Sequence, residues 1–469
     1  MSKTKLTKIV ATIGPASDTE ETIEKLITAG VNVFRFNTKH GTIEWHEQRI
    51  RRVQSVANRM GVSIGILLDL QGPEIRLETL NQESVPVAKG QTINVTPSFT
   101  PEVHSICIPH PLVFESLKPG DRMLVDDGLL EFRVISVKTN LIEVKSEDDG
   151  VLLNRKGVNF PGVDINLPSL IHEDLRKLDM ASTNKVDFVA LSFSRTKKDI
   201  EILRQEMDER RMKAMIVAKI ESMTALQHLD ELIEATDAVM VARGDLGVEV
   251  PIEQIAYWQK NIIRKSRLMK KPVITATQML QSMTENPRPT RAEATDVANA
   301  VLDGTDAVML SAETASGKYP VKAVESMSRI VHFNEMAYKY LPFEFEPKNE
   351  TDIVVDAVVH MLDQKEVKVK FILVFTHSGL TARSISRIRP KVPIIAVTKD
   401  QKVVEELTLS YGVDAIRDDI AEDEFKLPNK VIDDLVTKGV LEKGDLIVVV
   451  HGQNYYIQGS TNAVALIRV

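Results

Sequence analysis

The chain has 469 residues, a formal net charge of −7 and a hydrophobic content of 43%. This length is enough for more than one buried core, and the negative charge argues against a nucleic-acid-binding protein, which needs a large basic surface. The single cysteine, Cys107, excludes an intramolecular disulfide and fits a reducing compartment. No secretory leader pattern follows Met1 and no apolar run approaches membrane-spanning length, so we expect a soluble, cytoplasmic protein with no membrane partner.

Short apolar runs alternate with longer helical patterns through the first two thirds of the chain, which is typical of parallel βα units. Continuous apolar runs suit strands that are covered on both faces. Eight units of this kind predict an α/β fold, a closed (β/α)8 TIM barrel whose chemistry lies at the carboxyl ends of its strands. The eight runs are Lys8–Ile13, Asn32–Asn37, Ser63–Asp69, Asp187–Ser192, Met215–Ile220, Ala238–Arg243, Pro272–Thr277 and Ala307–Ser311.

The pattern changes twice along the chain, and each change indicates a further domain. After the third run, short β-like stretches separated by turn residues predict a small β domain at 73–156, inserted into a barrel formed by 1–72 and 157–342. On the catalytic face this insertion would act as a lid. After a linker at Phe343–Glu350, four apolar runs predict a C-terminal α/β domain at 351–469, near Phe371–Phe375, Pro393–Val397, Leu446–Val450 and Ala463–Ile467.

Polar residues gather where the apolar runs of the barrel stop. The segments Ala218–Ser222 and Val241–Gly247 place Lys219, Glu221 and Asp245 at two neighbouring strand ends. Two carboxylates with open positions left over suit Mg²⁺, which shares its remaining ligands with substrate and water. A polar residue at a single strand end caps a turn as readily as it takes part in catalysis. Polar residues at so many strand ends together predict an enzyme. The other such residues are Arg35, Asn37, Asp69, Ser192, Arg243, Thr277, Ser311 and Glu313.

Seven stretches, taken in order along nearly the whole chain, resemble pyruvate kinases. They are Ala11–Ser17, Gly72–Arg76, Lys156–Gly162, Ala218–Glu221, Met240–Gly247, Ala276–Leu280, and Asn286–Glu293 with Asp296–Ala300. The resemblance implies a barrel with a mobile β lid and a C-terminal α/β domain, in a homotetramer. It also implies the glycolytic transfer of a phosphoryl group from phosphoenolpyruvate to ADP, which gives pyruvate and ATP.

The resemblance also implies a role for individual residues. Lys219 would stabilise the transferring phosphoryl group and the developing enolate, with Arg35 and Thr277 as further catalytic residues. Glu221 and Asp245 would hold Mg²⁺ or Mn²⁺. The substrate carboxylate would meet Arg243, Gly244, Asp245 and Thr277. The nucleotide would meet Arg35, Asn37, His40, Arg76 and Lys156, although a solvated surface role is a serious alternative for His40 and Lys156. Ser311 and Glu313 match a proposed proton relay, with simple packing as the alternative.

Two positions depart from the family pattern at its potassium site. The family has Arg-x-Asn-Phe-Ser-His-Gly where this chain has Lys39 in place of the serine, and Asp-Thr-Lys-Gly-Pro-Glu where this chain has Leu70 in place of the threonine. Asn37 and Asp69 remain as a remnant of the monovalent site. A lysine ammonium supplies the charge of a potassium ion together with hydrogen-bond donors. We therefore expect Lys39 to pair with Asp69 or Glu74 and to replace K⁺; the alternative is that Lys39 points into solvent.

A second site is expected in the C-terminal domain. Thr376, Ser378 and Thr381 follow a predicted strand at the start of a helical pattern, and the family uses this loop for the phosphate of a sugar-phosphate effector. The loop His451–Asn462 would cover the other end of such an effector, and its Tyr455 and Tyr456 replace the small and basic residues expected for fructose bisphosphate. Capping of a structural helix is the alternative.

Two other functions stay open from the sequence. A catalytically impaired homologue could act as a sugar-phosphate or nucleotide sensor, which the changes at Lys39 and Leu70 favour and the intact catalytic positions oppose. A related barrel enzyme, such as an aldolase acting on pyruvate, would use a similar acidic metal site. It would need neither Arg35 nor Arg76 nor the inserted lid.

Overall fold

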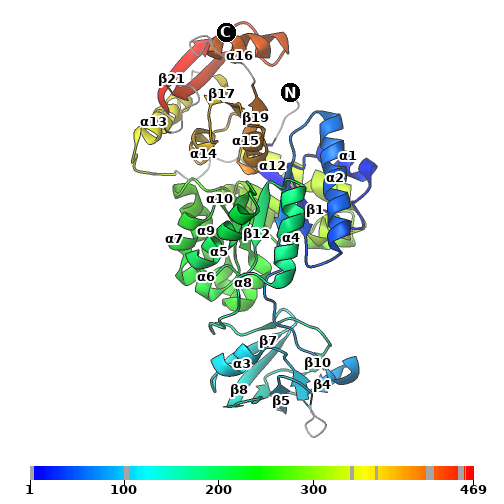
Figure 1. The fold of residues 1–469 in the computed structure, drawn as a ribbon. Helices are drawn as coiled ribbons and strands as arrows, with labels where there is room; N and C mark the ends of the chain where they lie inside the picture. Colours follow the sequence, from blue (N-terminus) through cyan, green and yellow to red (C-terminus); the bar gives the residue numbers. More distant parts are fainter. Residues whose placement is uncertain are drawn as a thin grey trace.

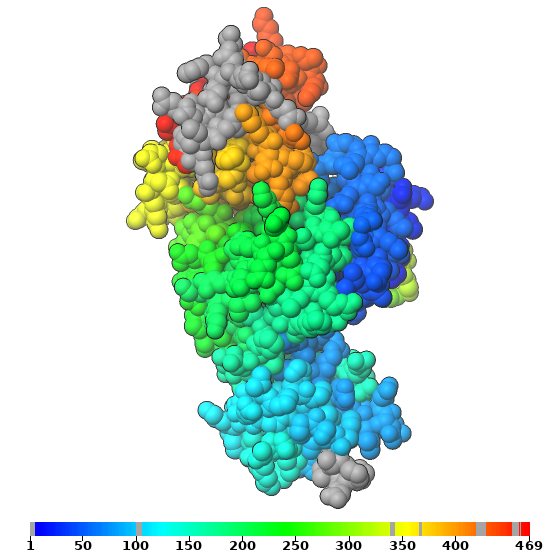
Figure 2. Space-filling view, viewed as in Figure 1, coloured from blue at the N-terminus to red at the C-terminus, as the bar shows by residue number. Residues whose placement is uncertain are grey.

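The structure is a computed structural model that describes residues 5–99, 105–337, 343–364, 368–418, 427–452, 459 and 461–469. Figure 1 shows three bodies in a row, with the inserted β domain in cyan at one end and the C-terminal domain in yellow to red at the other. The space-filling view narrows to a waist between the barrel and the inserted domain (Figure 2).

Eight parallel strands form a closed barrel, as predicted. β1 pairs with β2 on one side and with β16 on the other, which closes the ring. All eight apolar runs contain one of these strands. They are β1 (Lys8–Thr12), β2 (Val33–Asn37), β3 (Gly65–Asp69), β12 (Phe188–Leu191), β13 (Met215–Ile220), β14 (Ala238–Ala242), β15 (Val273–Ala276) and β16 (Ala307–Leu310).

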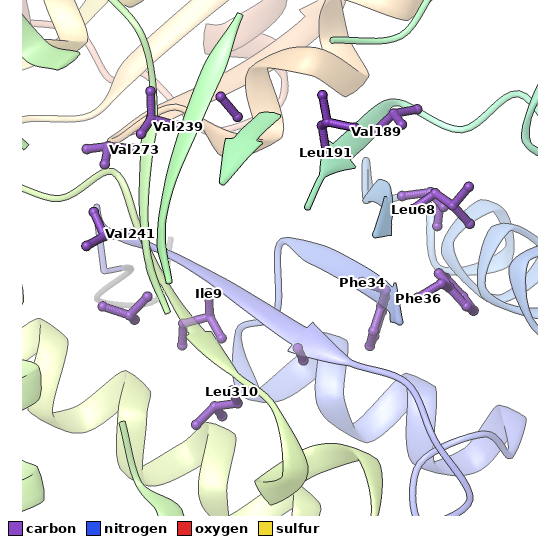
Figure 3. Close-up of a cluster of buried hydrophobic side chains, with 14 of the residues drawn as sticks. Ile9, Phe34, Phe36, Leu68, Val189, Leu191, Val239, Val241, Val273 and Leu310 are labelled. Atoms are coloured by element: carbon purple, nitrogen blue, oxygen red, sulfur yellow. The ribbon is translucent and has the colours of Figure 1, made fainter. Parts of the chain in front are cut away.

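Both faces of the barrel strands are buried, which explains why their sequences are continuously apolar. On β1, Val10 belongs to one buried cluster together with Val33 and Met309, whereas Ile9 and Ala11 belong to a second, larger cluster. Successive side chains of a strand point to opposite faces, so the two clusters lie on opposite sides of the barrel wall. Figure 3 shows labelled members of the larger cluster, which the barrel helices cover.

Four of the helices that follow the barrel strands begin at residues whose side chains cap them. Thr19, Thr42, Ser222 and Thr290 each accept a backbone N–H of the first helical turn through their side chains. The helices are α1 (Glu20–Ala29), α2 (Ile43–Met60), α4 (His172–Thr183), α5 (Lys197–Glu209), α6 (Met223–Gln227), α7 (Leu229–Ala235), α8 (Arg243–Glu249), α9 (Ile255–Leu268), α10 (Arg291–Asp303), α11 (Ala312–Ala315) and α12 (Pro320–Ala337), with short 3₁₀ turns η2 (Ile252–Gln254) and η3 (Gln281–Thr284).

The inserted domain lies between β3 and α4, as predicted, and has its own core around Ile106, Phe132 and Val144. A six-stranded sheet has the order β11-β7-β8-β9-β5-β6, and β4 pairs with β10. The elements are η1 (Leu80–Gln82), β4 (Val85–Val87), β5 (Thr92–Thr96), β6 (Ser105–Cys107), α3 (Pro111–Ser116), β7 (Arg122–Val125), β8 (Leu130–Lys138), β9 (Leu141–Ser146), β10 (Gly150–Leu152) and β11 (Val158–Asn159).

The C-terminal domain has a five-stranded sheet of order β19-β18-β17-β20-β21, in which β21 runs antiparallel to β20. Four strands were predicted; the fifth, β19, is an edge strand whose residues after the first are largely exposed, so it lacks an apolar run. The elements are α13 (Glu350–Leu362), β17 (Val369–Phe375), α14 (Leu380–Ser386), β18 (Ile394–Thr398), α15 (Gln401–Glu406), η4 (Leu407–Leu409), β19 (Val413–Arg417), α16 (Leu427–Thr437), β20 (Leu446–Gly452) and β21 (Thr461–Arg468).

The domain boundaries at 72, 157 and 342 stay predictions, and the last of them falls outside the described residues. Across the described parts of the chain, no helix combines the length and the apolar character needed to cross a bilayer.

Several ion pairs join the C-terminal domain to the barrel, among them that of Lys402 with Asp187. Lys402 Nζ donates to Asp187 Oδ1 at 2.6 Å, and the other oxygen of Asp187 accepts the Ile66 N–H at 2.8 Å. Burial, reinforced by the neighbouring Asp187 carboxylate, raises the pKa of Glu405 to about 7. Glu405 in the folded protein therefore holds its proton over a pH range in which the unfolded chain has lost it.

This difference predicts a stability that falls as the pH rises. Between pH 4.5, the ordinary glutamate pKa, and about pH 7, the folded state binds more protons than the unfolded state. The contribution of Glu405 to the free energy of unfolding is therefore present below this pH range and is lost above it. Glu405→Gln should remove this loss and be more stable than the parent at about pH 8, in urea unfolding measured across the window. The exposed Glu442 of the same domain supplies the control, Glu442→Gln, and an equal pH slope in all three proteins would contradict the assignment.

Candidate active site

A buried group of opposite charges lies at the carboxyl ends of β2, β3 and β13. Arg35 donates to Asp69 Oδ2 through Nε at 2.7 Å, and a second guanidinium nitrogen lies 2.6 Å from the same oxygen. Lys219 Nζ lies 3.4 Å from the other Asp69 oxygen. The exposed fractions are 8% for Arg35, 1% for Asp69 and 9% for Lys219, so the charges compensate one another away from bulk water.

Lys219 also reaches Glu221, two residues further along the same segment. Its Nζ lies 2.7 Å from Glu221 Oε1 and donates to Ser192 Oγ at 2.8 Å. The second carboxylate oxygen of Glu221 accepts the backbone N–H of Phe193 at 2.6 Å. Phe193 has φ of +55°, a sparsely populated conformation for a bulky residue. The strained backbone after β12 thus holds the carboxylate in place.

The electrostatics of this cluster favour a charged lysine. Burial alone lowers the pKa of Lys219, but the carboxylates of Asp69, Glu221 and Asp245 outweigh burial, so its pKa is raised. Burial, together with the Asp245 carboxylate, raises the pKa of Glu221 to about 7 against the opposing influence of Lys219. The buried Glu221 carboxylate and the half-buried Asp245 carboxylate near it therefore need more positive charge than Lys219 supplies.

Glu221 and Asp245 line one cleft of about 150 Å³, between the barrel and the base of the inserted domain. Its walls include Lys39 and Glu74 from one side and Asn159 from the inserted domain. In the described ranges, no group of three or more His, Cys, Asp or Glu residues has the arrangement of a metal cage. A pair of oxygen donors facing a cleft is instead the sparse set that Mg²⁺ uses when a substrate completes its coordination.

The residues predicted to meet the substrate carboxylate lie together at the start of α8 and after β15. Thr277 Oγ1 accepts the Gly244 N–H at 2.7 Å, and Thr277 itself has φ of +67°, which is an outlier for a β-branched residue. Arg243 differs from these residues, because its guanidinium already donates hydrogen bonds to acceptors within the protein. It donates to the carbonyls of Ala276 and Thr277 at 3.1 and 2.7 Å and to Asp296 at 2.7 Å. Arg243 therefore holds the strained segment that presents Thr277.

Lys39 pairs with Glu74, one of the two partners expected for it. Its Nζ lies 2.8 Å from Glu74 Oε1, while Arg76 donates to the other Glu74 oxygen at 2.9 Å. Asp69 is already engaged by Arg35 and Lys219. Leu70 is 1% exposed, so its side chain contributes packing and no oxygen ligand, while its backbone carbonyl accepts the Ser192 hydroxyl at 2.7 Å.

The remaining residues predicted to bind the nucleotide lie at the edge of the barrel and on the inserted domain. Asn37 accepts the Lys39 N–H through its side chain at 3.3 Å, and exposed His40 has a lowered pKa because of its partial burial and the adjacent Lys39. Lys156 pairs with Asp126 at 2.9 Å within the inserted domain, apart from the Arg35 cluster.

Residues of the predicted effector site lie in the C-terminal domain. Thr381 Oγ1 is 2.7 Å from Thr461 Oγ1, and Thr376 is buried with its N–H on the Val397 carbonyl. Ser378 is half-buried at the start of α14. Tyr455 and Tyr456, expected to cover this loop, lie outside the described residues.

The structure adds one residue that the sequence argument missed and explains another. Glu249 accepts hydrogen bonds from the Asn159 side chain and from the Gly162 and Met223 backbone, and burial raises its pKa. It stands four residues after Asp245, hence on the same face of α8, a spacing that could have identified it. Glu313, expected as one half of a proton relay, is fully buried and accepts the backbone N–H groups of Leu280 and Ser311 at 3.0 and 2.7 Å. Its carboxylate fixes two strand-end loops.

Comparison with known proteins agrees with this geometry. The family model described as "Pyruvate kinase, barrel domain" matches residues 4–324, and "Pyruvate kinase, alpha/beta domain" matches residues 352–467. A pyruvate kinase of Staphylococcus epidermidis is 41% identical over 464 residues, which cover 97% of this chain and 79% of the relative. One of Agrobacterium vitis is 40% identical over 462 residues, which cover 97% and 96%.

A solved structure of a pyruvate kinase from Cryptosporidium parvum superposes with a TM-score of 0.93 at 33% identity, covering 100% of this chain and 96% of that one. The agreement spans the barrel, the insertion and the C-terminal domain. The chain therefore belongs to the pyruvate kinase family and is a phosphotransferase.

Proposed function

We propose that the protein transfers the phosphoryl group of phosphoenolpyruvate to ADP and so forms pyruvate and ATP. The observation that carries the proposal is the buried cluster of Lys219, Arg35, Asp69 and Glu221 beside the cleft that Asp245 also lines. Phosphoryl transfer depends on positioning and on countercharge far more than on covalent chemistry. Lys219 is fixed by three protein partners and stays charged, so it offers a preorganised countercharge to the group in transfer.

Glu221 and Asp245 would hold the divalent cation, Mg²⁺ or Mn²⁺. The fit rests on the donor set, two carboxylates at one cleft, and on the raised pKa of Glu221, which shows the pair to be short of positive charge. Bound there, the cation would supply Lewis-acid stabilisation of charge on substrate oxygens. Lys219 and the Phe193 N–H orient Glu221 for this purpose.

Gly244, Asp245 and Thr277 would orient the substrate carboxylate. The Gly244 N–H and the Thr277 hydroxyl are half-buried donors at this corner: the N–H donates to Thr277 Oγ1, and the hydroxyl donates to the Ala276 carbonyl, each at 2.7 Å. An incoming carboxylate would compete for both groups. Arg243 acts here as a positioning residue, since its own donors hold the loop that carries Thr277.

On the nucleotide side we propose Arg35, Asn37, His40, Arg76 and Lys156. The forked guanidinium groups of Arg35 and Arg76 suit phosphate oxygens. Arg35 donates to Asp69, and Arg76 donates to Glu74, the partner of Lys39. Lys156 belongs to the inserted domain, so closure of that domain onto the barrel would bring its charge to the phosphates.

We further propose that catalysis does not require potassium, because Lys39 supplies the monovalent charge. Its ammonium stands 2.8 Å from Glu74, next to the cleft, and its side chain is 36% exposed. Leu70 removes one oxygen donor from the remnant site formed by Asn37 and Asp69, and the Asp69 carboxylate is already neutralised. The ammonium of Lys39 would thus supply the positive charge at a site that has lost ligands for a potassium ion.

A regulatory phosphate ligand and a homotetramer complete the proposal. Thr376, Ser378 and Thr381 are the effector contacts, and the Thr381–Thr461 hydrogen bond ties this loop to β21. Exposed apolar side chains such as Ile252, Tyr257 and Phe333, exposed by 77%, 63% and 67%, offer the surface that subunit contacts would cover.

Loss of the buried ammonium should abolish most of the chemistry. Lys219→Met is expected to lower kcat for pyruvate formation by roughly 100- to 1000-fold, since one preorganised electrostatic group is removed. The change in KM should be smaller. Lys8→Met is the matched control, because Lys8 is also buried on a barrel strand but donates to the Val413 carbonyl at the base of the barrel. Equal losses in both variants would mean a structural effect alone.

The potassium proposal predicts activity in a buffer free of potassium and ammonium. Pyruvate formation from phosphoenolpyruvate and ADP with Mg²⁺, at constant ionic strength, should change little when K⁺ is added. The double variant Lys39→Ser with Leu70→Thr restores the two lost oxygen donors and should become K⁺-dependent, whereas Leu70→Thr alone should not.

Each other result is informative. Strong K⁺ activation of the parent would keep the enzyme and overturn the role of Lys39. No activity in either buffer, from well-folded protein, would contradict the proposed function and favour the sensor.

A further inference from the structure

A small cationic cavity lies at the junction of the barrel and the C-terminal domain. It has room for about one water-sized sphere. Three lining cations come from the end of α9 and the loop after it, and three come from α14 and the residues after it. Together with Asp306 and two serines they line the cavity: Arg267, Lys270, Lys271, Arg383, Arg387, Arg389, Ser386 and Ser410.

Three of the lining residues carry buried polar atoms without a hydrogen-bond partner. They are one terminal nitrogen of Arg383, Nε of Arg387 and Oγ of Ser410. Arg387 is 4% exposed and Ser410 is fully buried. Buried donors are nearly always paired in folded proteins, and an unpaired one on a charged group is especially costly. Three unpaired donors at one cavity, two from α14 and its C-cap and one from Ser410, indicate a missing acceptor.

The carboxylates near the cavity are already engaged elsewhere. Asp352 binds Arg387 at 2.7 Å and Lys270 at 2.8 Å. Asp306 binds Arg389 at 2.7 Å and also accepts the backbone N–H groups of Val273 and Tyr411.

Further out, Asp237 pairs with Arg204 at 2.8 Å, and Glu406 is itself buried enough that its pKa is raised. Burial lowers the pKa of both Arg383 and Arg387, against the influence of these carboxylates. The guanidinium charges at the cavity are therefore incompletely compensated.

We propose that this cavity binds one monatomic inorganic anion of the size of chloride. The space excludes a sulfate or a phosphate, and the unpaired groups are a hydroxyl and charged N–H donors, which a spherical anion can accept together. A water molecule accepts only two hydrogen bonds and leaves the charge uncompensated. Because cations of both domains line the cavity, the bound anion holds the C-terminal domain on the barrel.

Crystals of the full chain grown in sodium bromide test the site directly. An anomalous difference peak beside Arg383, Arg387 and Ser410 is expected at the bromine edge. Density without anomalous signal, or a peak only at exposed side chains, would mean that water fills the cavity and would overturn the proposal.

Thermal unfolding tests it in solution. At constant ionic strength, replacing sodium gluconate by sodium chloride should raise Tm by roughly 2 to 4 °C and then saturate. Arg383→Met should abolish the chloride response, and Arg59→Met, which removes an exposed ion pair on α2, should keep it.

Ser410→Ala keeps the test decisive if Arg383→Met does not fold. Removing an unpaired buried hydroxyl should not destabilise the protein in gluconate, but it should shift the chloride midpoint upward. An unsaturating response, or the same response in every variant, would show only a general effect of salt and contradict the site. Neither result bears on the proposed phosphoryl transfer.

Discussion

The pairing of Lys219 with Asp69 and Glu221 is the interaction on which the catalytic face depends. Each charge costs several kcal/mol to bury, and the cost is offset only if the partners keep good geometry. That geometry requires the register in which Asp69 of β3 stands opposite Asn37 on one side and Ala190 on the other. A slip of one residue would move these side chains across the barrel wall. The strand register that closes the barrel is therefore the same register that assembles the site.

The inserted domain depends on the same strand end. β3 carries Asp69 and leads within a few residues to Gly72, whose φ of +69° suits glycine and whose N–H donates to Asp174 of α4. A Cβ at this position would lie 3.0 Å from that of Ser192, which itself bonds Lys219. On the return path, Glu249 binds Asn159 and Gly162. The inserted domain is therefore joined directly to the groups that surround the charge cluster.

Sequence patterns predicted the barrel from its apolar runs, and they predicted that the polar ends of those runs lie together, as Arg35, Asp69 and Lys219 do, because parallel strands bring such ends to one face. They could not predict partners set by tertiary packing. Arg243 meets Asp296 from α10, 53 residues away, and so serves the loop of Thr277 more than a substrate. Glu313 was a candidate relay, yet backbone groups take up both of its oxygens. β19 was missed because an exposed edge strand has no apolar run.

The distribution of charge in the site also explains why Lys39 pairs with Glu74. Asp69 was the other expected partner, but two cations already neutralise it inside the barrel, so the acid that lacks a buried partner attracts the ammonium. A pair exposed by 36% and 16% contributes little to stability, and stability does not explain why it is there. Position explains it better: the pair lies on the wall of the cleft that Glu221 and Asp245 also line. In the role proposed for Lys39, its ammonium needs no ion from solution, and the charge stays in place whatever the salt composition.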